Sequence, residues 1–222
     1  MSSLFITHYS PVYAAHDLSD QLLMPLGLNV VELLCSASYN HLNSKNYNEL
    51  GHILLKPPYK RTDWQNKNAF ALWIGEDKSH YLWALKYLTS ILGELAHRFP
   101  HRNLPKYSQH VDYFHSFAEQ LDTKKYNVSL GIKAADLSYP LHTSKNVSQD
   151  FVKYGETDVR LLHRYILFER YMYKYVRLHT WTNRTIPVWV FDPFLRECCR
   201  NENGNPTTKL AKHLKFYTPE LV

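Results

Sequence analysis

The stretch of residues 160–177 constrains the fold most, because its pattern predicts one long helix with two incompatible faces. At about 100° per residue, its basic side chains fall within a single stripe roughly 140° wide, opposite an apolar side. The stripe consists of Arg160, His163, Arg164, Arg170, Lys174 and Arg177. The apolar side consists of Leu161, Leu162, Tyr165, Ile166, Phe168, Met172, Tyr173 and Val176. Such a helix must bury its apolar side, so the remaining chain has to supply elements that cover it.

The basic stripe has two interpretations. A cation at each turn follows the charge repeat of a nucleic-acid backbone, and Tyr171 and Tyr175 at its edge offer rings on which bases can stack. The net charge of +6 favours the same class of partner, a polyanion. The alternative is the solvated face of an ordinary core helix. The predicted DNA contacts on this helix are Arg160, Arg164, Arg170, Lys174 and Arg177.

Helical periodicity also dominates the rest of the chain. Only seven glycines are present, against about fifteen expected from average usage, which favours long helices over a turn-rich sheet. We predict a mainly α fold, a single domain of six to seven helices spanning residues 1–222. The predicted helices cover residues 11–18 and 20–38, a short stretch from Asn68, and residues 78–100, 106–121, 160–177 and 206–216. Pro25 predicts a kink or a restart within its helix. Residues 122–150 predict a long loop that serves as a lid or binding segment, and residues 181–193 an irregular aromatic strap.

The cysteine usage and the absence of several motifs exclude some classes of protein. Cys35, Cys198 and Cys199 cannot form a disulfide framework, which favours a reducing compartment. We find no apolar run near the roughly 18 residues of a membrane span and no signal-peptide pattern, so we expect a cytoplasmic protein without a membrane partner. The sequence contains no glycine-rich phosphate loop and no Cys-x-x-Cys motif, so we expect no cofactor and no metal.

Three short blocks carry a family pattern. The first covers residues 14–23 and continues through residues 32–34. The second covers residues 59–66, 72–73 and 81–83, and the third covers residues 181–189. In this order they resemble blocks of the phage pyrimidine-dimer DNA glycosylases, with a possible relation to proteins that hypermodify thymine in DNA. The resemblance implies a DNA glycosylase-like helical fold that binds double-stranded DNA, turns a pyrimidine nucleotide out of the stack and acts on it in the cytoplasm of an infected host.

The chain departs from that pattern at two places. Asn29 stands where the family has its catalytic glutamate, and Glu32 follows one turn later. Lys67 and Asn68 replace the usual histidine-proline pair. Two alternatives to base excision therefore stay open. One is a transferase that attaches an amino acid or amine, as co-substrate, to an activated hydroxymethyl pyrimidine, and the other is a DNA-binding protein without catalysis.

Excision of the lyase type needs an unprotonated amine to attack the sugar and a carboxylate to move protons. Removal of Met1 would expose the main-chain amine of Ser2, whose pKa of about 7.7 to 8.0 lies far below the roughly 10.4 of lysine. The alternative for Ser2 is an ordinary chain terminus. The candidate carboxylates are Asp20, Glu32 and Glu169. Their structural alternatives are, in that order, a helix cap, an exposed helix edge and a partner of a buried cation.

Base recognition would fall to amide and aromatic side chains. Asn66 and Asn29 each offer a donor and an acceptor to a base edge, although either residue type also serves in turns and caps. Trp73 and Tyr81 are candidates for stacking a flipped base, while their helical spacing is also typical of core residues. The predicted phosphate contacts outside the basic helix are Lys60, Arg61 and Lys67.

Overall fold

The computed structural model describes residues 4–42, 68–121, 160, 163, 164, 167 and 179–191. Most of these residues are helical and none of them lies in a strand, which confirms the mainly α prediction for this part of the chain. The α-helices are α1 (Pro11–His16), α2 (Asp20–Leu42), α4 (Ala69–Glu76), α5 (Lys78–Arg98) and α6 (Val111–Gln120). Two 3₁₀ helices, η1 (Lys106–His110) and η3 (Val188–Phe191), complete the order.

The periodicity located these five helices to within a few residues, except that the segment predicted from residue 106 starts as η1 and becomes α-helical only at Val111. The predicted loop at 122–150 and the helix at 206–216 lie outside the described residues.

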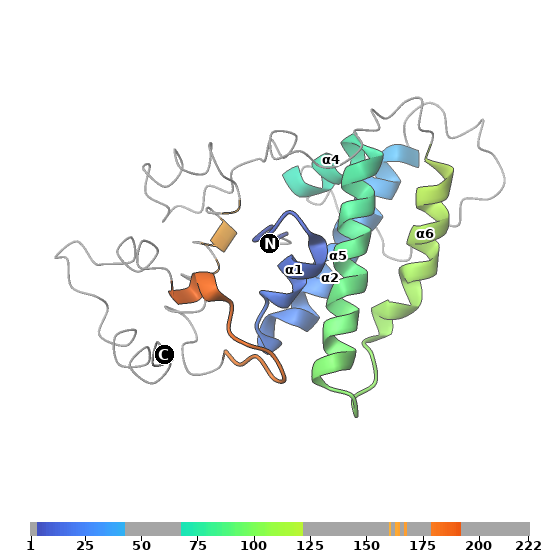
Figure 1. Cartoon of the computed structure of the whole chain (residues 1–222). Coiled ribbons are helices and arrows are strands. Elements are labelled where there is room, and N and C mark those ends of the chain that lie inside the picture. The colour runs from blue at the N-terminus through green and yellow to red at the C-terminus, as the bar shows by residue number, and fades with distance from the viewer. Residues whose placement is uncertain are drawn as a thin grey trace.

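Helix α5 is the central element of the fold. It contacts α1, α2, α4 and α6, and Figure 1 shows it between α2 and α6. Its start is fixed by Asp77, whose carboxylate accepts a hydrogen bond from the Ser79 amide at 2.6 Å. Side chains three and four residues apart then line its buried side. They are Tyr81, Ala84, Leu85, Leu88, Ile91, Leu92 and Leu95.

Helix α2 continues through Pro25 without a second start, so the predicted restart is wrong. Tyr107 packs against this part of α2, and its hydroxyl donates to the Met24 carbonyl at 3.2 Å. Gly27 permits this approach, because a Cβ at Gly27 would collide with the Tyr107 hydroxyl. Over residues 20–39 the helix is long and apolar enough to cross a membrane, contrary to our expectation that the chain has no such run. Most of that stretch is buried against the other helices, as expected for a core helix.

The N-terminal segment threads through the core beside the start of the basic helix. Leu4 and Ile6 are fully buried, and the Ile6 amide donates to Nδ1 of His163 at 2.9 Å. Arg164 donates through Nε to the Thr7 carbonyl at 2.9 Å. These contacts join residues about 157 positions apart in the sequence.

The described part of the basic stripe therefore faces the protein, which corrects our prediction for this half of the helix. The guanidinium of Arg160 lies 4.0 Å from the centre of the Tyr9 ring, and His163 and Leu167 are buried. Leu167 falls within the stripe on a helical projection. Because burial of this apolar side chain is favourable, the stripe residues beside it also face the N-terminal segment. Arg160 and Arg164 are consequently half-buried packing residues rather than a free DNA-binding face. Arg170, Lys174 and Arg177 lie outside the described residues.

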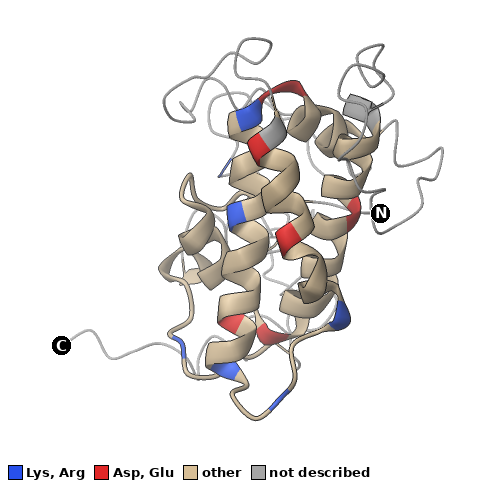
Figure 2. Ribbon diagram, turned by 90° about the vertical axis from the view of Figure 1, so that its right-hand side faces the viewer, with Lys and Arg blue, Asp and Glu red and all other residues tan. Residues whose placement is uncertain are grey.

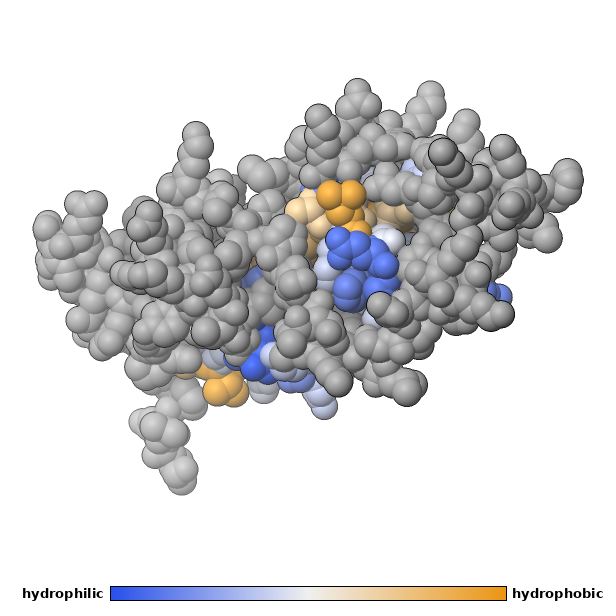
Figure 3. Space-filling model, turned by 90° about the horizontal axis from the view of Figure 1, so that it is seen from above, coloured by the Kyte–Doolittle hydropathy of each residue, from blue (hydrophilic) through white to orange (hydrophobic). Residues whose placement is uncertain are grey.

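The described surface has no continuous basic stripe on the face formed by α5 and α6, where acidic and basic residues are interspersed (Figure 2). Seen from above, the described residues present a small apolar patch beside a hydrophilic one (Figure 3). The large apolar side chains exposed in the described part of the chain are Tyr13, Met24, Leu28, Leu72, Leu82, Leu104 and Val188.

Candidate ligand pocket

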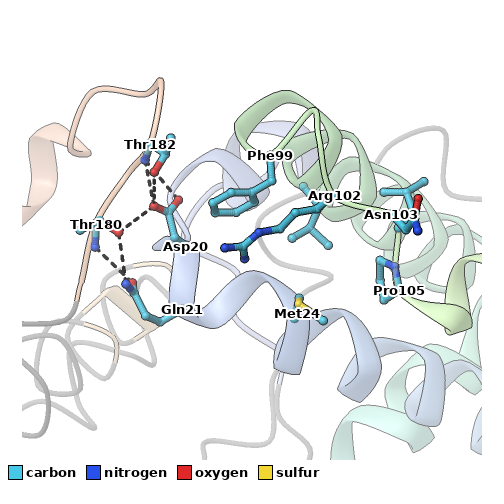
Figure 4. Close-up of a pocket in the computed structure, with 11 residues that line it drawn as sticks. Asp20, Gln21, Met24, Phe99, Arg102, Asn103, Pro105, Thr180 and Thr182 are labelled. Atoms are coloured by element: carbon cyan, nitrogen blue, oxygen red, sulfur yellow. Dashed lines mark hydrogen bonds between the residues drawn. The ribbon is translucent and has the colours of Figure 1, made fainter.

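A pocket of about 310 Å³ opens where the start of α2 meets the end of α5. Its outer wall is formed by the loop between α5 and η1 and by residues 179–191 (Figure 4). These residues overlap the strap predicted at residues 181–193, and the name strap is used for residues 179–191 from here on. The lining residues are Asp20, Gln21, Met24, Leu95, Phe99, Arg102, Asn103, Leu104, Pro105, Thr180 and Thr182.

Asp20 fastens the strap to α2. Its carboxylate accepts hydrogen bonds from the Thr180 hydroxyl at 2.7 Å, from the Thr182 hydroxyl at 2.8 Å and from the Thr182 amide at 3.0 Å. Arg98 donates to the other carboxylate oxygen at 3.0 Å. Burial raises the pKa of Asp20, but these hydrogen bonds outweigh that effect and hold the pKa below its usual value. Asp20 is thus an ionised anchor, and this arrangement argues against the proton-transfer role that we expected for it.

Gln21 adds a second clamp on the strap. Its side-chain oxygen accepts from the Thr180 amide and its side-chain nitrogen donates to the Thr180 hydroxyl, both at 3.1 Å. Because an amide N–H can only donate, the orientation of the Gln21 amide is determined. The Thr180 hydroxyl therefore accepts from Gln21 and donates to Asp20.

Glu94 and Arg98 form a buried polar hub behind the pocket. Glu94 accepts from Nε of Arg98 at 2.9 Å and from both Nε and Nη2 of Arg184 in the strap, at 3.0 and 2.7 Å. Nε2 of His16 lies 3.0 Å from the same carboxylate. Burial raises the pKa of Glu94, but hydrogen bonds from Arg184 and Arg98 hold it below its usual value. Arg98 also donates to the carbonyls of Leu18 and His16, so its charge is well satisfied.

This hub was not among the sequence-based predictions, although the sequence carries a signal for it. Glu94 and Arg98 stand four residues apart on the buried side of α5, among apolar residues. A charged pair at that spacing on an apolar face indicates a buried ion pair.

Arg102 is the cation that the pocket offers to a ligand. Its guanidinium lies 4.9 Å from the centre of the Phe99 ring, and its side chain reaches across the pocket towards α2 (Figure 4). Within the described ranges, no carboxylate forms an ion pair with it. One part of the wall around it is apolar, formed by Met24, Leu95, Phe99, Leu104 and Pro105, and the other part is polar, formed by Asp20, Gln21, Asn103, Thr180 and Thr182. The pocket thus suits a ligand with a flat or apolar body and an anionic group.

Trp73 and Tyr81 lie in the core rather than in a base pocket. Each is about 2% exposed. The Trp73 ring stacks on His80 with centroids 4.2 Å apart, and the Tyr81 hydroxyl lies 3.1 Å from the Ser38 hydroxyl. Burial raises the pKa of Tyr81 well above its usual value. These rings have no open face for a nucleobase, so our stacking prediction for them is wrong.

The remaining candidates that the structure describes do not line the pocket. Asn29 and Glu32 are half-buried on α2 and do not line it. The candidates outside the described residues are Ser2, Lys60, Arg61, Asn66, Lys67 and Glu169. Among the residues that are described, no group of three or more His, Cys, Asp or Glu side chains is suited to a metal. No family model, curated protein or solved structure matches the chain.

Proposed function

We propose that this protein binds DNA and holds one pyrimidine nucleotide, turned out of the stack, in the pocket beside Arg102. The observation that carries the proposal is the Arg102 guanidinium, which pairs with no carboxylate among the described residues and lines a pocket whose wall is partly apolar. A nucleotide combines a flat base with a phosphate, and a guanidinium binds phosphate through paired hydrogen bonds. The volume of about 310 Å³ lies at the lower end of the range for small-molecule pockets, which suits a single small ligand.

The convergence of two sequence blocks supports the proposal. The block at 14–34 and the block at 181–189 meet at the pocket, where Thr182 binds Asp20 and the Trp181 indole donates to the Asp17 carbonyl at 3.3 Å. Both blocks carry the resemblance to DNA glycosylases. The net charge of +6 adds a general attraction to DNA.

The described pocket supports group transfer as a second candidate reaction beside base excision. Excision would use a carboxylate beside the sugar, and the acceptor positions of Asp20 are filled by Arg98 and the strap. A transferase that acts on an activated hydroxymethyl pyrimidine needs cations for the leaving pyrophosphate, a role that suits Arg102. Transfer of an amino acid or amine is therefore our second candidate, beside a glycosylase whose catalytic groups lie outside the described residues.

Binding measurements on Arg102→Ala test the proposal. We expect its affinity for duplex DNA to fall about tenfold or more, because charged hydrogen bonds contribute about 1.5–3 kcal/mol. The slope of log affinity against log salt should become shallower by about 0.9, the value for one lost phosphate contact. Lys86→Ala is the matched control, since it removes an exposed positive charge from α5 away from the pocket. Equal slopes for the two variants would contradict a phosphate contact at Arg102.

Two chemical assays separate the reactions. Borohydride trapping on damaged DNA yields a covalent adduct only if the protein is a lyase. Incubation with pyrophosphorylated hydroxymethyl DNA and an amino-acid mixture, followed by mass spectrometry of the nucleosides, shows a mass gain only for a transferase. Salt-sensitive binding without either signal identifies a non-catalytic DNA-binding protein.

A further inference from the structure

Tyr13 is an unusually supported exposed ring. It lies in α1, and 57% of its surface is accessible. The imidazole of His8 lies 4.9 Å from it and that of His16 lies 5.9 Å away, centre to centre. Isolated exposed apolar residues are common on protein surfaces, but here two further rings hold the exposed one in place.

Both supporting rings are themselves fixed. Nδ1 of His8 accepts a hydrogen bond from the Ser10 amide at 3.0 Å, so the neutral ring carries its proton on Nε2. Nε2 of His16 lies 3.0 Å from Glu94, which Arg98 and Arg184 also hold. The Tyr13 ring is therefore presented on a rigid base, which lowers the entropy cost of stacking a planar ligand on it.

The hub that supports Tyr13 also builds the pocket. Arg98 donates to the His16 carbonyl at 3.1 Å and to Asp20 at 3.0 Å, and Asp20 holds the strap residues that line the pocket. The residue that supports the exposed ring and the residue that anchors the pocket wall are thus linked through one side chain, Arg98.

We infer that Tyr13, with His8 and His16, is a stacking site for an unpaired DNA base next to the nucleotide held in the pocket. The inference rests on the proposed function. Turning one nucleotide out of a duplex leaves neighbouring bases unstacked, and an aromatic ring offsets that loss. A protein partner fits less well, because stable protein interfaces need a broad patch rather than one supported ring.

An oligonucleotide with 2-aminopurine next to the target thymine tests the inference, because this base loses fluorescence when it stacks on an aromatic ring. We expect quenching with the wild-type protein and with Tyr13→Phe, and loss of quenching with Tyr13→Leu and Tyr13→Ala. The affinity of Tyr13→Ala should fall by between about 5-fold and 150-fold, the range measured for base–aromatic stacking. Leu82→Ala, at a site 43% exposed on α5 and outside the pocket lining, should leave both signals unchanged.

Tyr13→Leu keeps an apolar side chain on α1, so loss of quenching there reflects loss of the ring rather than of the fold. Unchanged quenching and affinity in Tyr13→Leu, with a weakened Arg102→Ala, overturn the stacking site and leave the proposed function standing. Wild-type affinity in both Tyr13→Ala and Arg102→Ala contradicts the proposed function as well. Quenching lost in Tyr13→Phe also overturns the inference, because the ring is still present.

Discussion

The two ends of α5 contrast sharply. Its first turns belong to an aromatic cluster in which Trp83 packs against Trp73 and Tyr81 packs against Phe117, with all four rings buried. Its last turns carry Glu94 and Arg98, also buried, but bound to the strap and to α1. Residue types associated with base stacking thus form the core, and residue types associated with the surface hold the candidate site together. A residue's pairing and depth, rather than its type, decide which role it takes.

The largest expected effect is at the polar end. Arg98→Ala removes a side chain that is 2% exposed and leaves Glu94 and Asp20 without their shared cation. Breaking a buried ion pair by deleting one partner costs about 3–5 kcal/mol. We expect that loss in the free energy of unfolding, measured by urea denaturation. Arg102→Ala is the control and should change stability by less than about 0.5 kcal/mol, since Arg102 is exposed. If both variants lost only a small and similar amount of unfolding free energy, the buried Arg98 would contribute no more to stability than the exposed Arg102.

Close packing between α2 and η1 gives the next effect. Gly27→Ala places a methyl group against the Tyr107 ring, whose hydroxyl is the nearest atom. Overpacking of this kind costs about 1–3 kcal/mol. Thermal or urea unfolding of Gly27→Ala and of the double variant with Tyr107→Phe should show partial recovery in the double variant, because the nearest atom is gone. A double variant as unstable as the sum of its parts would mean that Tyr107 is not the obstacle.

Acid should weaken the polar end selectively. The folded-state pKa values of Asp20 and Glu94 are held below their unfolded values, so these carboxylates stabilise the fold above their unfolded pKa values and lose that contribution as pH falls. Burial also lowers the pKa of His16, so below about pH 6.5 the unfolded state takes up its proton first and stability falls in the same direction. Unfolding measured from about pH 5 down to about pH 2 should show a shallower decline for Asp20→Asn than for the wild type, because a lowered carboxylate pKa places the loss in that window. Parallel curves would mean that Asp20 does not contribute.

The contrast also explains what the sequence could and could not predict. Helices α1, α2, α4, α5 and α6 follow from local periodicity and from Gly and Pro positions, so their ranges were predictable. The strap contacts join residues about 160 positions apart, such as Ser19 with His179 and Asp20 with Thr180, and no local pattern encodes such pairs. The side of the basic helix that faces the protein was also hard to predict, because the buried Leu167 is a single apolar residue within the charged stripe.

Pocket residues were predictable only in part. Asp20 was a candidate carboxylate with a helix cap as its structural alternative, but its four donor groups come from the strap and from α5. Arg102 follows the end of α5 in a polar loop, where a single arginine carries no distinguishing signal. Its relevance depends on Phe99 and on apolar side chains from α2, which only the packed structure brings together.

The smallest effect tests the aromatic end. Tyr81→Phe removes a hydroxyl that lies 3.1 Å from the Ser38 hydroxyl, while Ser38 keeps its bond to the Leu34 carbonyl at 2.8 Å. Because the Ser38 hydroxyl retains a partner, we expect a loss of about 0.5–1.5 kcal/mol in unfolding free energy. DNA affinity should stay at the wild-type level, since Tyr81 is about 2% exposed and does not line the pocket. A large drop in affinity with little change in stability would return Tyr81 to the site, and the division of α5 into a structural and a functional end would fail.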